Sequence, residues 1–143
     1  MGSLDGKVAF ITGVARGQGR SHAVRLASEG ADIIGIDICA DIASNGYPMA
    51  TPEELDETVA LVEAEGATML GSIADVRDFA TVKAAVDAGV AQFGRLDIVC
   101  ANAGIAAMSF GDLTDAEDLQ CGPTYWTSTW SGPSTPPKRR SPT

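Results

Sequence analysis

A short apolar run, a glycine cluster and a helix-like segment follow one another near the start of the chain. Residues 7–12 (KVAFIT) form a β-rich apolar run, as expected of a buried strand. Three glycines follow it, at Gly13, Gly17 and Gly19. Residues 21–29 then carry apolar side chains at helical spacing and end at a glycine suited to a C-terminal cap. A strand, a tight turn and a helix are therefore predicted in immediate succession, which restricts the fold more than any other feature.

The same alternation continues along the chain. Further apolar runs that predict strands lie at 31–37, 67–75 and 96–101. Helices are predicted between them, over 51–65, where Thr51-Pro-Glu-Glu54 is a capping box, and from Asp78 to Gly94. A further capping box at 114–117 predicts the start of another helix. Continuous apolar strands that alternate with amphipathic helices indicate an α/β fold with a parallel sheet covered on both faces. We expect the N-terminal half of a doubly wound Rossmann sheet, with strand order 3-2-1-4.

Composition divides the chain near residue 120. All 19 acidic residues lie in 1–118, whereas residues 120–143 carry no acid, five of the seven prolines and nine Ser or Thr. Such a Pro/Ser/Thr-rich segment is typical of disorder. We therefore expect a half-domain at 1–119 and a disordered tail at 120–143.

Charge and cysteine usage exclude several classes of function. The formal net charge of −9 argues against nucleic acid or an anionic membrane as the main partner. No apolar stretch reaches about 18 residues, and the first residues lack a signal-peptide profile. Cys39, Cys100 and Cys121 form no C-x-x-C pair, so neither a disulfide framework nor a metal site is predicted. We expect a cytoplasmic protein.

The glycine loop suits a pyrophosphate. Glycines let the backbone turn tightly and approach the anion, and the helix N-terminus offers free N–H groups. Arg16 and Gln18 lie in this loop; Arg16 is interpreted either as a phosphate contact or as a solvated arginine. Asp37 ends the second strand, 18 residues after Gly19, close to the spacing of a carboxylate that binds the adenosine ribose. Because a carboxylate repels a 2′-phosphate, NAD is favoured over NADP; the alternative is an aspartate that only caps a turn.

Three motifs resemble those of the short-chain dehydrogenases/reductases. Thr12-Gly-x-x-x-Gly-x-Gly19 resembles the family's cofactor loop, Asp75-Val76 its pair after the third strand, and Ala101-Asn-Ala-Gly104 its N-N-A-G motif with Ala in place of the first Asn. The resemblance implies an NAD-dependent oxidoreductase acting on a secondary alcohol or ketone. It assigns Asp75 and Val76 to the adenine. It also implies that the floor near the nicotinamide ribose is lined by Asn102, Ala103 and Gly104. A homo-oligomer is implied for the full-length parent only.

A second resemblance concerns the segment after the second strand. Residues 17–22 (GQGRSH), Asp37-Ile-Cys39 and the long loop at 38–50 are similar to the mycofactocin-coupled, carveol-dehydrogenase-like subgroup. The subgroup's insertion here is associated with tightly held NAD. A solvated surface insertion is the alternative interpretation of the loop.

The family's catalytic residues have no counterpart in this sequence. The family uses a Ser and a Tyr-x-x-x-Lys, but neither Tyr47 nor Tyr125 has a lysine four residues later. Read one base earlier, the codons of Trp126 and Thr127 give Asp, and the following codons permit Val-Asn-Leu. Asp-Val-Asn-Leu resembles the family's helix after the fourth strand. We therefore expect a frame change between about Leu119 and Gly122 and a chain inactive alone. The alternative is a non-catalytic nucleotide-binding fragment or an unstable truncated product.

Overall fold

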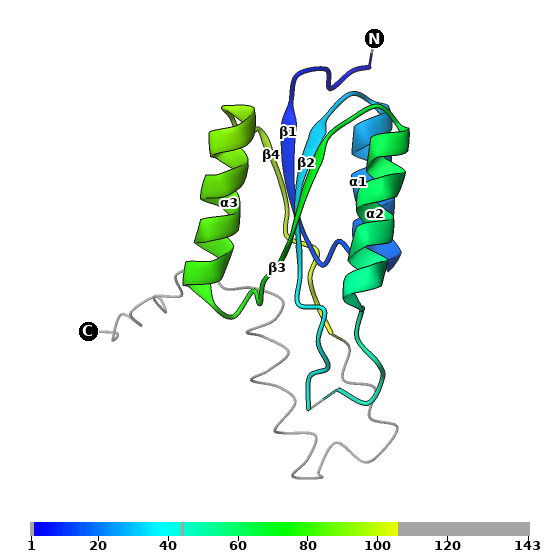
Figure 1. Ribbon diagram of the computed structural model, residues 1–143, viewed down its shortest axis with the longest axis vertical. Coiled ribbons are helices and arrows are strands. Elements are labelled where there is room, and N and C mark those ends of the chain that lie inside the picture. The colour runs from blue at the N-terminus through cyan, green and yellow to red at the C-terminus, as the bar shows by residue number, and fades with distance from the viewer. Residues whose placement is uncertain (1, 44, 106–143) are drawn as a thin grey trace, which may run out of the picture.

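Four parallel strands form one sheet in the order β3-β2-β1-β4 in the computed structural model, which describes residues 2–43 and 45–105 (Figure 1). The strands are β1 (Val8–Thr12), β2 (Asp32–Asp37), β3 (Met69–Ile73) and β4 (Ile98–Cys100). β1 pairs in parallel with both β2 and β4. This arrangement confirms the predicted α/β fold and strand order. The helix predicted to start at 114 and the tail at 120–143 lie outside the described residues.

Helices cover both faces of the sheet, as Figure 1 shows. α1 (Gly17–Ser28) and α2 (Pro52–Ala64) lie on one face, and α3 (Phe79–Phe93) lies on the other. Two hydrophobic clusters correspond to these faces, one with Ile11 and Ile33 at its centre and one with Phe10 and Ile34. Successive strand residues point to opposite faces of the sheet. Because helices cover both faces, all five β1 residues are buried. β1 therefore contributes side chains to both hydrophobic clusters.

Local signals place the helix ends, with one difference from the prediction. The Thr51 side chain accepts a hydrogen bond from the Glu54 N–H, and the Glu54 carboxylate accepts one from the Thr51 N–H, so the predicted capping box is present. Gly94 ends α3 in the left-handed conformation, with φ +79°. α1 begins at Gly17, four residues before the apolar periodicity indicates. Gly17 and Gly19 carry no apolar side chain, and glycine is a poor helix former. The apolar periodicity alone therefore predicts a helix start that is too late.

No described helix combines the length and the apolar character needed to cross a membrane.

Asp97, which precedes β4, is hydrogen-bonded to Val8 at the start of β1. Its carboxylate accepts the Val8 N–H at 3.0 Å and pairs with Arg95 at 2.6 Å and Lys7 at 3.8 Å. The hydrogen bonds from Arg95 and Val8 lower the pKa of Asp97 to about 2. A carboxylate whose pKa is lowered by folding stabilises the folded state above its unfolded pKa.

We expect Asp97→Asn to lower the free energy of unfolding at pH 7, because the neutral amide loses both cationic partners. The contribution of Asp97 is complete above about pH 4 and is lost as pH falls towards about 2. Urea denaturation of the two proteins at pH 7 and at pH 2.5 measures this. The wild-type advantage should shrink at the lower pH; a constant difference between the proteins would contradict the assignment.

Candidate functional site

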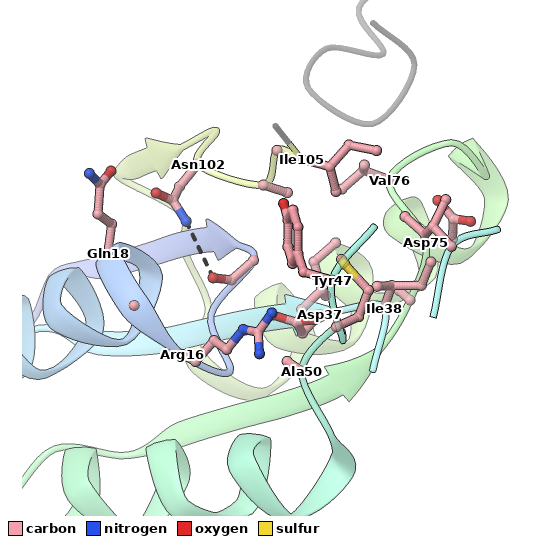
Figure 2. Close-up of a pocket in the computed structure, with 18 residues that line it drawn as sticks. Arg16, Gln18, Asp37, Ile38, Tyr47, Ala50, Asp75, Val76, Asn102 and Ile105 are labelled. Carbon is pink, nitrogen blue, oxygen red and sulfur yellow. Dashed lines mark hydrogen bonds between the residues drawn. The ribbon is translucent and has the colours of Figure 1, made fainter. Parts of the chain in front are cut away.

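A cavity of about 340 Å³ opens at the carboxyl ends of the strands. Segments that follow all four strands line it (Figure 2), as expected for a ligand site in an open parallel sheet. Ten of the eleven site residues predicted from the sequence are among its lining residues: Gly13, Arg16, Gly17, Gln18, Asp37, Asp75, Val76, Asn102, Ala103 and Gly104. The eleventh, Gly19, is not a lining residue and has a packing role.

The glycine loop brings two backbone segments into direct contact. Gly13 has φ +69°, and a Cβ on Gly19 would lie 1.9 Å from the Gly13 carbonyl oxygen. A side chain at Gly19 would therefore separate α1 from the end of β1, and one at Gly13 would meet Ala103 in the segment after β4, with its Cβ 2.9 Å from the Ala103 Cα. Gly17 also has a positive φ, +58°, and a Cβ there would meet open space. Room for a ligand is thus left at the first residue of α1.

The N-terminus of α1 faces this cavity. Its first residues Gly17 and Gln18 line the cavity, and no acidic residue lies in its first turn. The N-cap residue, Arg16, makes no side-chain capping hydrogen bond. The unpaired amides at a helix N-terminus and the positive end of the dipole favour an anion.

Thr12 ties the glycine loop to the segment after β4. Its hydroxyl oxygen accepts the N–H groups of Asn102 at 3.0 Å and Ala103 at 2.9 Å. In return, the Asn102 side-chain amide donates to the carbonyl oxygens of Thr12 at 3.0 Å and Gly13 at 3.3 Å; Figure 2 shows the contact with Gly13. These reciprocal bonds hold two walls of the cavity at a fixed separation.

Asp37 is buried at the end of β2, with 7% of its surface exposed. Its carboxylate oxygens accept the Ala15 N–H at 3.0 Å and the Cys39 N–H at 3.3 Å. It therefore caps the turn after β2 and also lines the cavity, so the two interpretations of this residue are compatible. A carboxylate offers about four acceptor positions, which leaves capacity for hydroxyl groups of a ligand.

The long loop after β2 forms a wall of the cavity. Its lining residues are mostly apolar and were missed by the sequence analysis: Ile38, Ile42, Tyr47, Met49 and Ala50. Figure 2 shows the Tyr47 ring on the cavity side of this loop. The Arg16 guanidinium donates to the Pro48 carbonyl oxygen at 2.6 Å. The loop is therefore part of the site and not only a solvated insertion, and Arg16 is a contact between the two walls.

Asp75 lines the cavity on the β3 side and is paired with Arg77. Arg77 Nε lies 3.0 Å and 2.8 Å from the two carboxylate oxygens, and Nη2 lies 2.5 Å from Oδ2. The hydrogen bonds from Arg77 lower the pKa of Asp75. Asp75 is thus held as an anion at the cavity edge.

Three further side chains, those of Cys39, Cys100 and His22, do not line the cavity. Cys39 and Cys100 are half-buried. Burial and the neighbouring Asp37 charge raise the pKa of the Cys39 thiol to about 11, so this thiol stays protonated at neutral pH. His22 lies exposed on α1. Among residues 2–43 and 45–105, no group of three or more His, Cys, Asp or Glu could hold a metal ion.

Comparisons with known proteins agree with this arrangement. The family model described as short chain dehydrogenase matches residues 7–122. (−)-trans-Carveol dehydrogenase of Rhodococcus erythropolis is 53% identical over 110 residues, which cover 77% of this chain and 40% of that protein. An uncharacterised NAD-dependent oxidoreductase of Mycobacterium tuberculosis is 57% identical over 120 residues, covering 83% and 43%.

A solved structure gives the same result. The crystal structure of carveol dehydrogenase from Mycobacterium avium in complex with NAD superposes with a TM-score of 0.78 at 53% identity. The match covers 83% of this chain and 43% of that chain. This chain therefore spans about 40% of the length of the relatives it matches.

We expect Thr12→Val to destabilise the protein by about 1–3 kcal/mol, because two partly buried N–H groups lose their acceptor. Thr12→Ser keeps the hydroxyl and is the matched control, with a much smaller loss. Urea denaturation followed by circular dichroism measures both. A Thr12→Val variant as stable as the wild type, or one destabilised no more than Thr12→Ser, would contradict this interpretation.

Proposed function

This chain belongs to the short-chain dehydrogenase family, and from that premise we propose that its described residues form the NAD-binding part of a cytoplasmic oxidoreductase. The substrate class is a secondary alcohol or ketone. When bound, NAD supplies the nicotinamide carbon that accepts or returns a hydride. The observation that carries the proposal is the buried Asp37, which lines the cavity and accepts the Ala15 N–H of the glycine loop.

Each wall of the cavity has a part in the proposed complex. The N-terminus of α1 and the backbone at Gly13 and Gly17 hold the pyrophosphate, and Gly19 permits the close approach that forms this cradle. Asp37 accepts hydrogen bonds from the adenosine ribose hydroxyls. Asp75 and Val76 contact the adenine. The segment Asn102, Ala103 and Gly104 lies beneath the nicotinamide ribose. The open space at Gly17 and the anion-favouring helix end support this fit.

Selectivity for NAD over NADP follows from the charge on Asp37. A 2′-phosphate would lie against a buried carboxylate and repel it. The only hydrogen bonds described for the Asp37 carboxylate come from backbone amides, those of Ala15 and Cys39. Among the described lining residues Arg16 carries the positive charge, and its guanidinium is directed to the Pro48 carbonyl. The relative crystallised with NAD is consistent with this selectivity.

We expect NAD to raise the melting temperature of the 143-residue chain, and NADP to raise it much less. At a concentration of 100 times Kd, a ligand stabilises a folded protein by about 2.7 kcal/mol. Asp37→Asn should weaken NAD binding by about tenfold, because charge-assisted hydrogen bonds become neutral ones. Asp56→Asn removes the same charge from an exposed position on α2 and is the matched control.

Thermal-shift measurements with both cofactors test the selectivity for NAD and whether the 143-residue chain folds. Equal stabilisation by NAD and NADP would contradict the role of Asp37. A wild-type chain with no melting transition would favour the alternative, an unstable truncated product.

We further propose that residues 120–143 derive from a frame change and that the 143-residue chain is inactive alone. The end of the family match at residue 122 and the short coverage of the relatives support this. The DNA across codons 115–145, read one base earlier, should open a continuing sequence with a Ser and a Tyr-x-x-x-Lys. A stop within a few codons would refute the frame change.

A non-catalytic nucleotide-binding module is the second candidate, favoured by the absence of Tyr-x-x-x-Lys from the 143 residues. Absorbance of NADH with a panel of secondary alcohols tests activity directly. We expect the chain to stay at background and the frame-restored protein to reduce NAD. Turnover by the 143-residue chain would overturn the assignment of the chemistry to residues beyond it.

A further inference from the structure

A second polar cluster lies behind the glycine loop, outside the cavity lining. The Ala15 carbonyl oxygen accepts hydrogen bonds from Arg20 Nε at 3.1 Å, Arg20 Nη2 at 2.7 Å and the Thr58 hydroxyl at 3.0 Å. Ala15 and Thr58 are fully buried. One carbonyl group is thus the shared acceptor for side chains of both α1 and α2, and the Thr58 hydroxyl also lies 3.1 Å from the Glu54 carbonyl oxygen.

The same residue is held on its other side. The Ala15 N–H donates to the Asp37 carboxylate at 3.0 Å. Ala15 is therefore fixed between Asp37 at the cavity and the Arg20–Thr58 pair behind it. The described chain has no cis peptide bond, and in a trans peptide the N–H points opposite to the carbonyl. The carbonyl of Ala15 points towards Arg20 and Thr58, so the Arg16 N–H points away from them.

Arg20 also reaches the helix that follows the long loop. Nη2 donates to the Glu54 carbonyl oxygen at 2.9 Å, and Nη1 lies 2.8 Å from Glu57. The Arg20 side chain is only 23% exposed, whereas that of Glu57 is 60% exposed. An ion pair with such an exposed partner contributes little. The contacts with the Ala15 and Glu54 carbonyls therefore account for the burial of this arginine.

We propose that Arg20, acting with Thr58, is a positioning residue for the dinucleotide. It fixes the carbonyl of the peptide between Ala15 and Arg16, while Asp37 accepts the N–H of the preceding peptide. Ala15 joins the two peptides, so Arg20 fixes Asp37 and the first turn of α1 relative to each other. The inference rests on the proposed NAD site. A purely structural role would instead hold α1 against α2 and leave ligand affinity unchanged once the protein is folded.

Calorimetric titration with NAD and with ADP-ribose tests the proposal. ADP-ribose carries the adenosine and pyrophosphate but no nicotinamide. Arg20→Gln should weaken both ligands by about tenfold, because the lost bonds involve a charged donor. Thr58→Val, which keeps the side-chain shape, should weaken both by about threefold, and Thr58→Ser should restore wild-type affinity. Arg25→Gln, at a 73% exposed arginine of the same helix, should bind as wild type.

Each outcome decides the matter. Titrations are made where circular dichroism and urea denaturation show each variant folded; if Arg20→Gln does not fold, the Thr58 pair alone decides. Lower stability with unchanged affinity would overturn the proposal in favour of a structural role. Weaker binding of NAD with unchanged binding of ADP-ribose would also overturn it. If the wild-type chain binds neither ligand, both the NAD site and this inference are refuted. If the wild-type chain binds both ligands and the variants bind them equally well, only this inference is refuted.

Discussion

The fold and the candidate site both depend on the close approach of backbone segments at the carboxyl end of β1. α1 can begin beside β1 only because Gly19 lies against the Gly13 carbonyl, where a Cβ would be 1.9 Å from the oxygen. The Asn102 amide then donates to the Gly13 and Thr12 carbonyls, which satisfies acceptors that the tight turn takes out of the sheet. A larger residue at either glycine would open the cavity and leave these acceptors unpaired. The packing of the sheet and the shape of the site are therefore set by the same contacts.

This geometry lets an acidic chain present an anion site. Residues 1–118 contain all 19 acidic side chains of the protein, and the site itself contains Asp37 and Asp75. Arg77 pairs with Asp75. Arg16 donates to the Pro48 carbonyl oxygen, and Arg20 donates to the carbonyl oxygens of Ala15 and Glu54. Attraction for a pyrophosphate then comes mainly from amide groups at the start of α1. The arginines contribute by holding those amides and the long loop in place.

Local pattern predicted the elements and the strand order, because apolar runs and caps are encoded within a few residues of each other. Ten of the residues that the sequence analysis assigned to the site do line the cavity: the glycine loop and Asp37 were assigned from their chemistry and spacing, and Asp75, Val76 and the segment 102–104 from the family resemblance. Local pattern did not predict Tyr47 or Met49 as lining residues, because their positions depend on how the loop after β2 folds back. Nor did it find the Arg20–Thr58 contact, which joins residues 38 positions apart. The early start of α1 has the same origin: the close contact of Gly19 with the Gly13 carbonyl overrides a poor helix propensity.

The long loop and the glycine loop consequently form one unit. Arg16 joins the glycine loop to Pro48 within the long loop, and Arg20 joins Ala15 to Glu54 just after it. Ile42 and Ala50 anchor the loop by burial. A ligand in the cavity contacts both sides of this unit, so its binding energy stabilises the loop as well as the glycine turn. A change that favours an open loop in the unliganded protein would weaken ligand binding by the free energy needed to close the loop again. The insertion after β2 is therefore held against the glycine loop by Arg16, and Arg20 holds the start of α2, which follows the insertion, against Ala15.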